Sequence, residues 1–412
     1  MNIPLARSPA SPLTDPVFRR FLWIVVGGVG WLGLLALGAM LFMQTPPRAG
    51  FDLALILDAG RRVAAGGPVY LAGAVSTGTQ VESLFYSYPP PVAQLASLAA
   101  AVPDVAVLLG IGAISVAGFV AVAARLRSRI APDGPSVAGP VLALAPFGYP
   151  FAVALLFGNI DATFPFVYGA VIAAVVAGSG RWRLAGGLLL GLATVAKLYP
   201  GLLLLWLLVR GLRMRGGPGA RLIPGEWRIL FFAMATIVAS VAASVAVGGL
   251  GPWQDYVDVV RSGAGATFAS ALNIGPASQI ALLTGDPEVA ARVAPLVALV
   301  AILLAALAAW VVRGAALSLT IAATASLFIL PITWFHYPVA LLPFAAWAWI
   351  AAPPGRGRTA VALLVAAAIL VAGGAVAAPV VVWVAVACVI GAVLVATSAR
   401  ARLGSGGLAD LL

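Results

Sequence analysis

The chain has few charged residues and very few chemically reactive side chains. Only 9% of its 412 residues are charged, whereas a soluble domain carries roughly 25%. It has one cysteine, Cys388, so no disulfide can form within the chain, and one histidine, His336. No phosphate-binding glycine loop is present, and this excludes a pump that carries its own ATPase. The composition thus excludes a soluble globular protein.

Long apolar runs dominate the sequence instead. Hydrophobic residues make up 62% of the chain and the mean hydropathy is +1.08. The runs reach about 20 residues and do not alternate, which favours transmembrane helices over a β-barrel. The predicted fold class is an all-α polytopic membrane protein with about 12 transmembrane helices (11–13) and amphipathic helices in its outer loops. The expected spans are roughly 21–43, 104–124, 138–156, 162–178, 185–197, 200–212, 228–249, 290–312, 316–333, 337–351, 358–374 and 377–397.

The arginines predict how these spans are oriented. A net charge of +11 would suggest nucleic acid in a soluble protein, but in a membrane protein basic clusters mark the cytoplasmic loops. We therefore expect no nucleic-acid partner. The resulting plan is a single integral membrane domain over 1–412, with cytoplasmic tails at 1–20 and 398–412. Two large extracytoplasmic loops are expected at 44–93 and 250–289. Residues 90–102 are expected to form a half-membrane or tilted helix.

This topology places a set of uncommon polar residues on the outer side, although only the basic clusters were used to derive it. Ionisable residues at membrane depth are functional candidates. The set comprises Asp52, Asp58, Asn159, Asp161, Lys197 (the only lysine), Tyr199, Asn273 and His336.

The two aspartates of FDLALILDAGRR have different alternatives. Asp52 precedes an apolar-periodic run, so it is either a helix N-cap, a chemical group, or both. Asp58 lies three and four residues before Arg61 and Arg62, which is the spacing of an ion pair on one helix face. Such a pair could be purely local, or it could orient an arginine toward a lipid phosphate.

The remaining candidates also have a structural alternative. His336, in ITWFHYP, is either a packed core histidine or a group that contacts a phosphate or moves a proton. Lys197 either extends to the interface or neutralises a phosphate. Tyr86 and Tyr88 could be interfacial belt residues. The scattered acids with one histidine and one cysteine lack metal-ligand spacing, so neither a metal nor another cofactor is expected.

Four ordered segments resemble glycosyltransferase family 87. An Asp-Leu pair opens the outer-loop helix in FDLALILDAGRRVAAGGPVY and is followed by FYSYPPPVAQ. GNIDATFPFVYG is similar to the family's Gly-Gln-x-Asn segment, and LATVAKLYPG to its Lys-x-x-Pro span. LFILPITWFHYP resembles its Pro-Ile-Ser-Trp-x-His motif. The matches run in the family's order over residues 52–343.

The resemblance implies a GT-C fold and a membrane α-mannosyltransferase. Such an enzyme takes mannose from a polyprenyl-phosphate donor and transfers it, with inversion, to a glycolipid or lipid-linked glycan acceptor at the extracytoplasmic face of the cell membrane. By the family motifs, Asp52 is the general base and His336 the second catalytic residue. Donor phosphate and substrate are expected to contact Lys197, Arg61, Arg62, Asp58, Tyr86, Tyr88, Asn159, Asp161, Tyr199, Asn273 and Trp334.

The sequence departs from the family pattern at three positions. Asn159 stands where glutamine is usual, Asp161 where asparagine is usual, and Thr333 where serine is usual. These changes bear on the acceptor and the sugar more than on the reaction type. Two other functions remain open: a transporter or flippase of lipid-linked sugars, and a GT-C transferase that uses a different polyprenyl-phosphate sugar.

Overall fold

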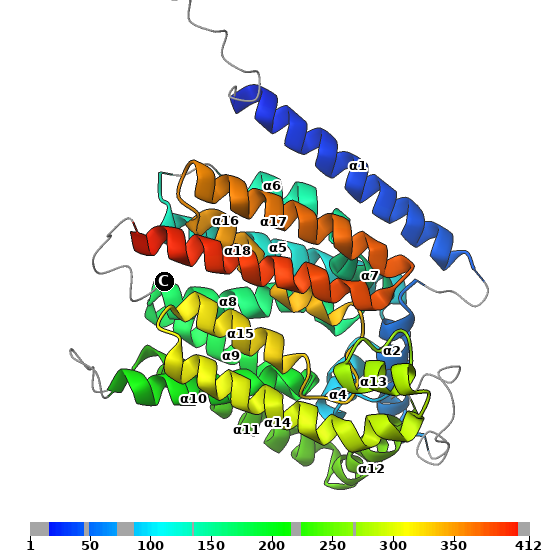
Figure 1. Ribbon diagram of the computed structural model, residues 1–412. Helices are drawn as coiled ribbons and strands as arrows, with labels where there is room; N and C mark the ends of the chain where they lie inside the picture. The colour runs from blue at the N-terminus through cyan, green and yellow to red at the C-terminus, as the bar shows by residue number, and fades with distance from the viewer. Residues whose placement is uncertain are drawn as a thin grey trace, which may run out of the picture.

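The computed structural model describes residues 16–44, 49–71, 86–133, 136–215, 224–266 and 269–402. Long helices run roughly side by side and form one bundle (Figure 1). Within the described ranges, the only strand-like pairing is an isolated antiparallel bridge between Asn273 and Trp334. The all-α prediction is therefore confirmed.

Six helices are long and apolar enough to cross a membrane, and a bent pair could form a seventh span. The six are α1 (Pro16–Phe42), α5 (Asp104–Ile130), α11 (Gly225–Gly248), α14 (Pro287–Val311), α17 (Arg356–Gly373) and α18 (Val382–Arg402). The bent pair consists of α6 (Ala138–Leu144) with its 3₁₀ extension Ala145–Phe147, and α7 (Tyr149–Phe157), which meet at 74°. Several crossings of this kind make the chain a multi-pass membrane protein.

The count of about 12 full spans is not reached, because five of the predicted spans are shorter helices. These are α8 (Phe164–Ala177), α9 (Gly180–Ala196), α10 (Leu202–Arg215), α15 (Ala315–Ser326) and α16 (Leu342–Ala351). At about 1.5 Å per residue, a 12-residue helix such as α15 extends only about 18 Å. Residues 90–102, expected to be a half-membrane helix, contain the eight-residue helix α4 (Pro90–Ser97).

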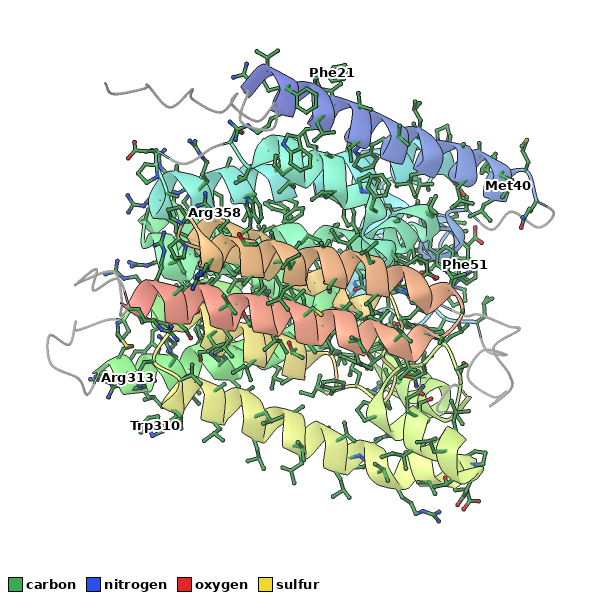
Figure 2. All side chains as sticks on the ribbon, turned by 45° about the horizontal axis from the view of Figure 1, so that its top comes forward. Phe21, Met40, Phe51, Trp310, Arg313 and Arg358 are labelled. Atoms are coloured by element: carbon green, nitrogen blue, oxygen red, sulfur yellow. The ribbon has the colours of Figure 1, made fainter. Side chains whose placement is uncertain are left out.

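Arginines bind the helix ends together at one end of the bundle. Arg210 donates to the carbonyl oxygens of Val312 and Arg313 at 3.0 and 2.7 Å. Arg400, on the last helix, donates to Ala351 at 2.7 Å and to Ile130 at 3.0 Å. Val312 and Arg313 directly follow α14, while Ala351 and Ile130 are the last residues of α16 and α5. The guanidinium groups therefore cap the C-terminal ends of these helices. Arg313 and Arg358 lie together at this end, opposite Phe51 (Figure 2).

The opposite end carries the short amphipathic helices. They are α2 (Phe51–Ala64), α4, α12 (Gly251–Ala266) and α13 (Pro276–Thr284). Tyr70, Tyr86, Tyr88 and Tyr256 are buried together there, in a cluster that joins α2 and α4 to α12. The separation of the basic end from this polar end is the arrangement that the arginine pattern predicts.

Candidate active site

Asp52 lies in the first turn of α2 and is not the N-cap. The helix begins at Phe51, and the capping position is taken by Gly50. Its φ of 70° lies in the left-handed region, which glycine adopts readily. Gly50 donates its N–H to the carbonyl of Leu156 at 2.7 Å, which fixes the entry of α2 against the end of α7. The expectation that capping aims the Asp52 side chain is therefore wrong.

Gly158 brings the segment GNID directly against α2. It ends α7 with a φ of 66°, and a Cβ atom built on it would lie 2.6 Å from the Cβ of Leu53, the residue after Asp52. No other residue type fits both the conformation and the space. This close approach places Asn159 beside the carboxylate of Asp52.

Gly158→Ala is expected to lower turnover as well as stability. A non-glycine residue in the left-handed region costs about 1–2 kcal/mol, and here the new methyl group would also push α2 away from Asn159. Gly285→Ala is the matched control, because Gly285 has a φ of 69° and nothing within 4 Å of its Cβ position. Both variants should lose similar unfolding free energy from strain, but only Gly158→Ala should lose turnover. Equal turnover in the two folded variants would show that the approach of α2 has no bearing on activity.

A single hydrogen bond fixes the carboxylate of Asp52. Asn159 donates from Nδ2 to Oδ2 of Asp52 over 2.6 Å. The Asn159 carbonyl oxygen accepts from the backbone N–H of Asp161 at 2.9 Å and from Nζ of Lys197 at 3.2 Å. Because two donors occupy that oxygen, the amide can face Asp52 only with its nitrogen. The orientation of Asn159 is thus determined by its own neighbours.

Burial raises the pKa of Asp52 above its usual value. His336, the Asn159 amide and Lys197 each act in the opposite direction, and the negative charge of Asp161 adds to the rise. A carboxyl group with a raised pKa is a better proton acceptor than an ordinary aspartate. Asp52 is half-buried, so its free oxygen is positioned to receive a proton from a substrate.

Asn159→Leu should move the acid limb of the pH–rate profile to higher pH. The amide stabilises the charged form of Asp52, and its loss raises the pKa of that carboxyl further. If the reaction needs the carboxylate, activity falls as pH drops through this pKa, so the fall should begin at a higher pH than in the unaltered protein. The measurement is kcat/KM across the acid range with purified protein. An unchanged acid limb would show that the essential base seen in the pH–rate profile is not Asp52.

Asp161 and Lys197 form a buried ion pair next to Asn159. Oδ2 of Asp161 accepts from Nζ of Lys197 at 2.7 Å, and Oδ1 accepts from the hydroxyl of Tyr199 at 3.1 Å. The Asp161 side chain is fully buried and that of Lys197 is 10% exposed. Nζ also lies 4.0 Å from the ring centroid of Tyr337, within cation–π range. All three donors of the ammonium group therefore have a protein partner nearby.

His336 completes the group. Its Nε2 lies 3.5 Å from Oδ2 of Asp161, within ion-pair range but beyond an ordinary hydrogen bond. The ring is held edge-on between Phe335 and Tyr337. Both ring nitrogens are buried without a hydrogen-bond partner among the described residues. Since buried polar atoms are nearly always paired, the imidazole has hydrogen-bonding capacity that none of the described residues uses.

Other predicted site residues have different contacts. Arg61 pairs with Asp58 at 2.9 Å and with Asp104. Arg62 donates to the carbonyls of Pro68 and Val69 at 3.4 and 2.9 Å and so makes no pair with Asp58. The local ion pair predicted for Asp58 is thus formed with Arg61, and Arg62 is turned toward the loop that follows α2.

Three further candidates contribute to the framework around the site. Asn273 is fully buried, and its Oδ1 accepts from the backbone N–H of Thr333 at 2.8 Å. Through the bridge with Trp334, it fixes the segment that leads into His336. The hydroxyl of Tyr86 donates to Pro89 at 2.9 Å within the aromatic cluster of the outer end. The ring of Tyr88 lies 5.8 Å from Nζ of Lys197, so Tyr88 adjoins the ion pair.

Sequence reasoning missed the role of Tyr337. Its ring stacks on Tyr199 at 5.2 Å and covers the Lys197 ammonium. The available signal was its position between the only histidine and Pro338, at the start of the 3₁₀ helix Tyr337–Leu341 (η5). Within the described ranges, no three His, Cys, Asp or Glu residues gather in a way that could hold a metal ion.

A bundle of apolar helices that carries this buried polar site near one end defines a multi-pass membrane protein. A sequence model of glycosyltransferase family 87 matches residues 86–333, more than half of the chain. The chain belongs to this family, and it is a membrane glycosyltransferase. Comparison with curated proteins and with solved structures gave no match. The matched range contains Asn159, Asp161 and Lys197, while Asp52 and His336 flank it.

Proposed function

We propose that the protein transfers mannose from polyprenyl-phosphate mannose to a glycolipid or lipid-linked glycan acceptor at the extracytoplasmic face of the cell membrane, within a GT-C fold. The observation that carries this proposal is the pairing of two unlike groups in one site. Asp52 offers a carboxylate whose pKa is raised by burial, and His336 offers an imidazole whose nitrogens have no protein partner. A transferase needs a base for the acceptor and a donor group for the leaving phosphate.

The proposed step is a single displacement at the anomeric carbon. The acceptor oxygen forms a bond to C1 of a β-linked mannose while its proton passes to Asp52. The bond from C1 to the phosphate oxygen breaks, and the polyprenyl phosphate leaves with the electron pair. Inversion at C1 gives an α-linked product. In the proposed step His336 donates a hydrogen bond to the leaving phosphate, and Lys197 adds positive charge nearby while remaining bound to Asp161.

An apolar cavity supports a lipid-linked donor. It has a volume of about 350 Å³ and is lined by residues of α1, α5, α6, α16, α17 and α18, among them Trp23, Phe119, Leu342 and Trp349. Pro338 and Leu341 of η5 lie on its wall, and this short helix begins directly after His336. A phosphate held at His336 would therefore have an apolar space next to it for its prenyl chain.

The rival function is transport or flipping of a lipid-linked sugar. Alternating access would place the polar site near mid-membrane, between repeats, whereas this site adjoins α2 at one end of the bundle. A third candidate is transfer of another sugar from a polyprenyl-phosphate donor, which would need the same base and the same phosphate contacts.

Product formation by purified protein in detergent discriminates among these functions. Transfer needs no second compartment, so labelled polyprenyl-phosphate mannose and candidate lipid acceptors should give a labelled α-mannoside in micelles. Label that moves only across proteoliposome membranes, without a new glycosidic bond, would favour transport. Transfer from a different polyprenyl-phosphate sugar, with none from the mannose donor, would favour the third function.

His336→Ala should weaken use of the donor more than use of the acceptor. A hydrogen bond to a charged group contributes about 1.5–3 kcal/mol, which corresponds to roughly a 10- to 150-fold loss in kcat/KM for the donor. The measurement is the set of kinetic constants for each substrate at saturating levels of the other. Unchanged donor kinetics would return His336 to a packing role among Phe335 and Tyr337.

A further inference from the structure

Among the acids of the described ranges, Asp161 alone is fully buried. Its two oxygens accept from Lys197 and Tyr199, and Nε2 of His336 lies 3.5 Å away. A carboxylate that is fully enclosed cannot touch a sugar, and its negative charge would repel a phosphate. The contacts of Asp161 are with protein groups, and these contacts define its role in the site.

The backbone and side chain of Asp161 act on two different parts of the site. Its N–H binds the Asn159 carbonyl oxygen at 2.9 Å, and its carboxylate holds Lys197, which binds the same oxygen at 3.2 Å. Both contacts force the Asn159 nitrogen toward Asp52, where it donates over 2.6 Å. A continuous path of contacts thus runs from Asp161 through Lys197 and Asn159 to the carboxylate of Asp52.

We propose that Asp161 is a positioning residue that sets the geometry of the base and of the phosphate-binding side at once. The carboxylate fixes Lys197, and through Lys197 and Asn159 it fixes Asp52. The oxygen that accepts from Lys197 also lies 3.5 Å from Nε2 of His336. This proposal rests on the transferase function proposed above.

Charge balance explains why Asp161 and Lys197 must be considered together. Removing one partner of a buried ion pair leaves an uncompensated charge, while removing both is far less costly. The informative set is therefore Asp161→Asn, Lys197→Met and the double variant. Ser326→Ala is the matched control: Ser326 is equally buried and hydrogen-bonded, to Tyr168 at 3.1 Å, outside the site.

Folded Asp161→Asn protein should turn over on the order of 10²-fold more slowly, because a displacement of about 1 Å in a catalytic group costs that much. The pH–rate profile should also change, since loss of the Asp161 charge lowers the pKa of Asp52 and moves the acid limb to lower pH. The other groups that act on Asp52 are Lys197 from the end of α9, His336 before η5, and Asn159 before η3 (Ile160–Thr163). Ser326→Ala should change neither quantity.

The double variant keeps the test decisive if Asp161→Asn does not fold. It should be more thermostable in detergent than either single variant, yet its turnover should remain as low as that of Asp161→Asn. Folded Asp161→Asn protein, or folded double variant, with unaltered kcat and an unaltered acid limb would overturn the proposal. So would a loss that merely follows the amount of folded protein.

A binding assay with polyprenyl phosphate alone tests this proposal without depending on which sugar the enzyme transfers. The thermal shift that this lipid gives should be present in the unaltered protein and lost or reduced in Asp161→Asn. If the unaltered protein shows neither a shift nor any transfer, the proposed transferase chemistry fails. The stability coupling between positions 161 and 197 would still report whether the two residues form one unit, and its absence would overturn the positioning role.

Discussion

Asp52→Asn should abolish transfer while leaving the fold and donor binding intact. The change preserves the size of the side chain and removes its ability to accept a proton, and loss of a general base typically costs about 10²- to 10⁴-fold in rate. Asn159 could still contact the new amide oxygen, so α2 should stay in place. Transfer is measured with labelled donor in detergent, and donor binding by a thermal shift with the same lipid.

Asp255→Asn is the matched control for this experiment. Asp255 lies on α12 at the same end of the molecule, but its side chain is exposed. The identical change there should leave turnover as it was. Transfer by Asp52→Asn at a rate close to that of the control would remove Asp52 as the base and would require another acceptor for the hydroxyl proton.

Lys197→Met should be the most destabilising single change in the site. It leaves the fully buried Asp161 carboxylate without its cation, and breaking a buried pair from one side costs about 3–5 kcal/mol. Methionine has a similar length, so loss of packing contributes little. The free energy of unfolding in mixed detergent micelles is the measurement.

Arg261→Met provides the comparison for an exposed pair. Arg261 lies 3.8 Å from Asp258, and both side chains are more than half exposed. Such pairs contribute about 0–1 kcal/mol, because solvent screens them. A loss for Lys197→Met no greater than that for Arg261→Met would show that Asp161 does not depend on the ammonium group for its charge.

The sequence predicted where most helices lie, because apolar runs and proline-glycine breaks are local features. It did not predict their lengths across the membrane. The 74° bend between α6 and α7 follows from Gly148 and Pro150, two residues that also occur in unbent helices, so hydropathy alone shows one span there. For the same reason the predicted span 316–333 runs several residues past the end of α15 at Ser326. The segment after Ser326 instead holds the backbone N–H of Thr333 against Asn273.

The candidate site was predicted as a group of residues and not as a geometry. The arginine pattern places Asp52, Asn159, Lys197 and His336 on one side of the membrane, and the structure brings them together. The bond between Asp52 and Asn159 joins positions 107 residues apart, so no local pattern could reveal it. Arg62 shows the opposite case, because its sequence spacing fits an ion pair but a nearby carbonyl pair takes its donors.

The arginines at the other end of the bundle also constrain the order of assembly. Arg400 supplies the donors for Ala351 and Ile130, and it lies on the last helix, 270 residues after Ile130. Those two carbonyls therefore have no access to this partner during most of translation. This end of the bundle can close only after α18 has been made, so Arg400, which belongs to a basic cluster that predicts orientation, also joins α18 to α5 and α16.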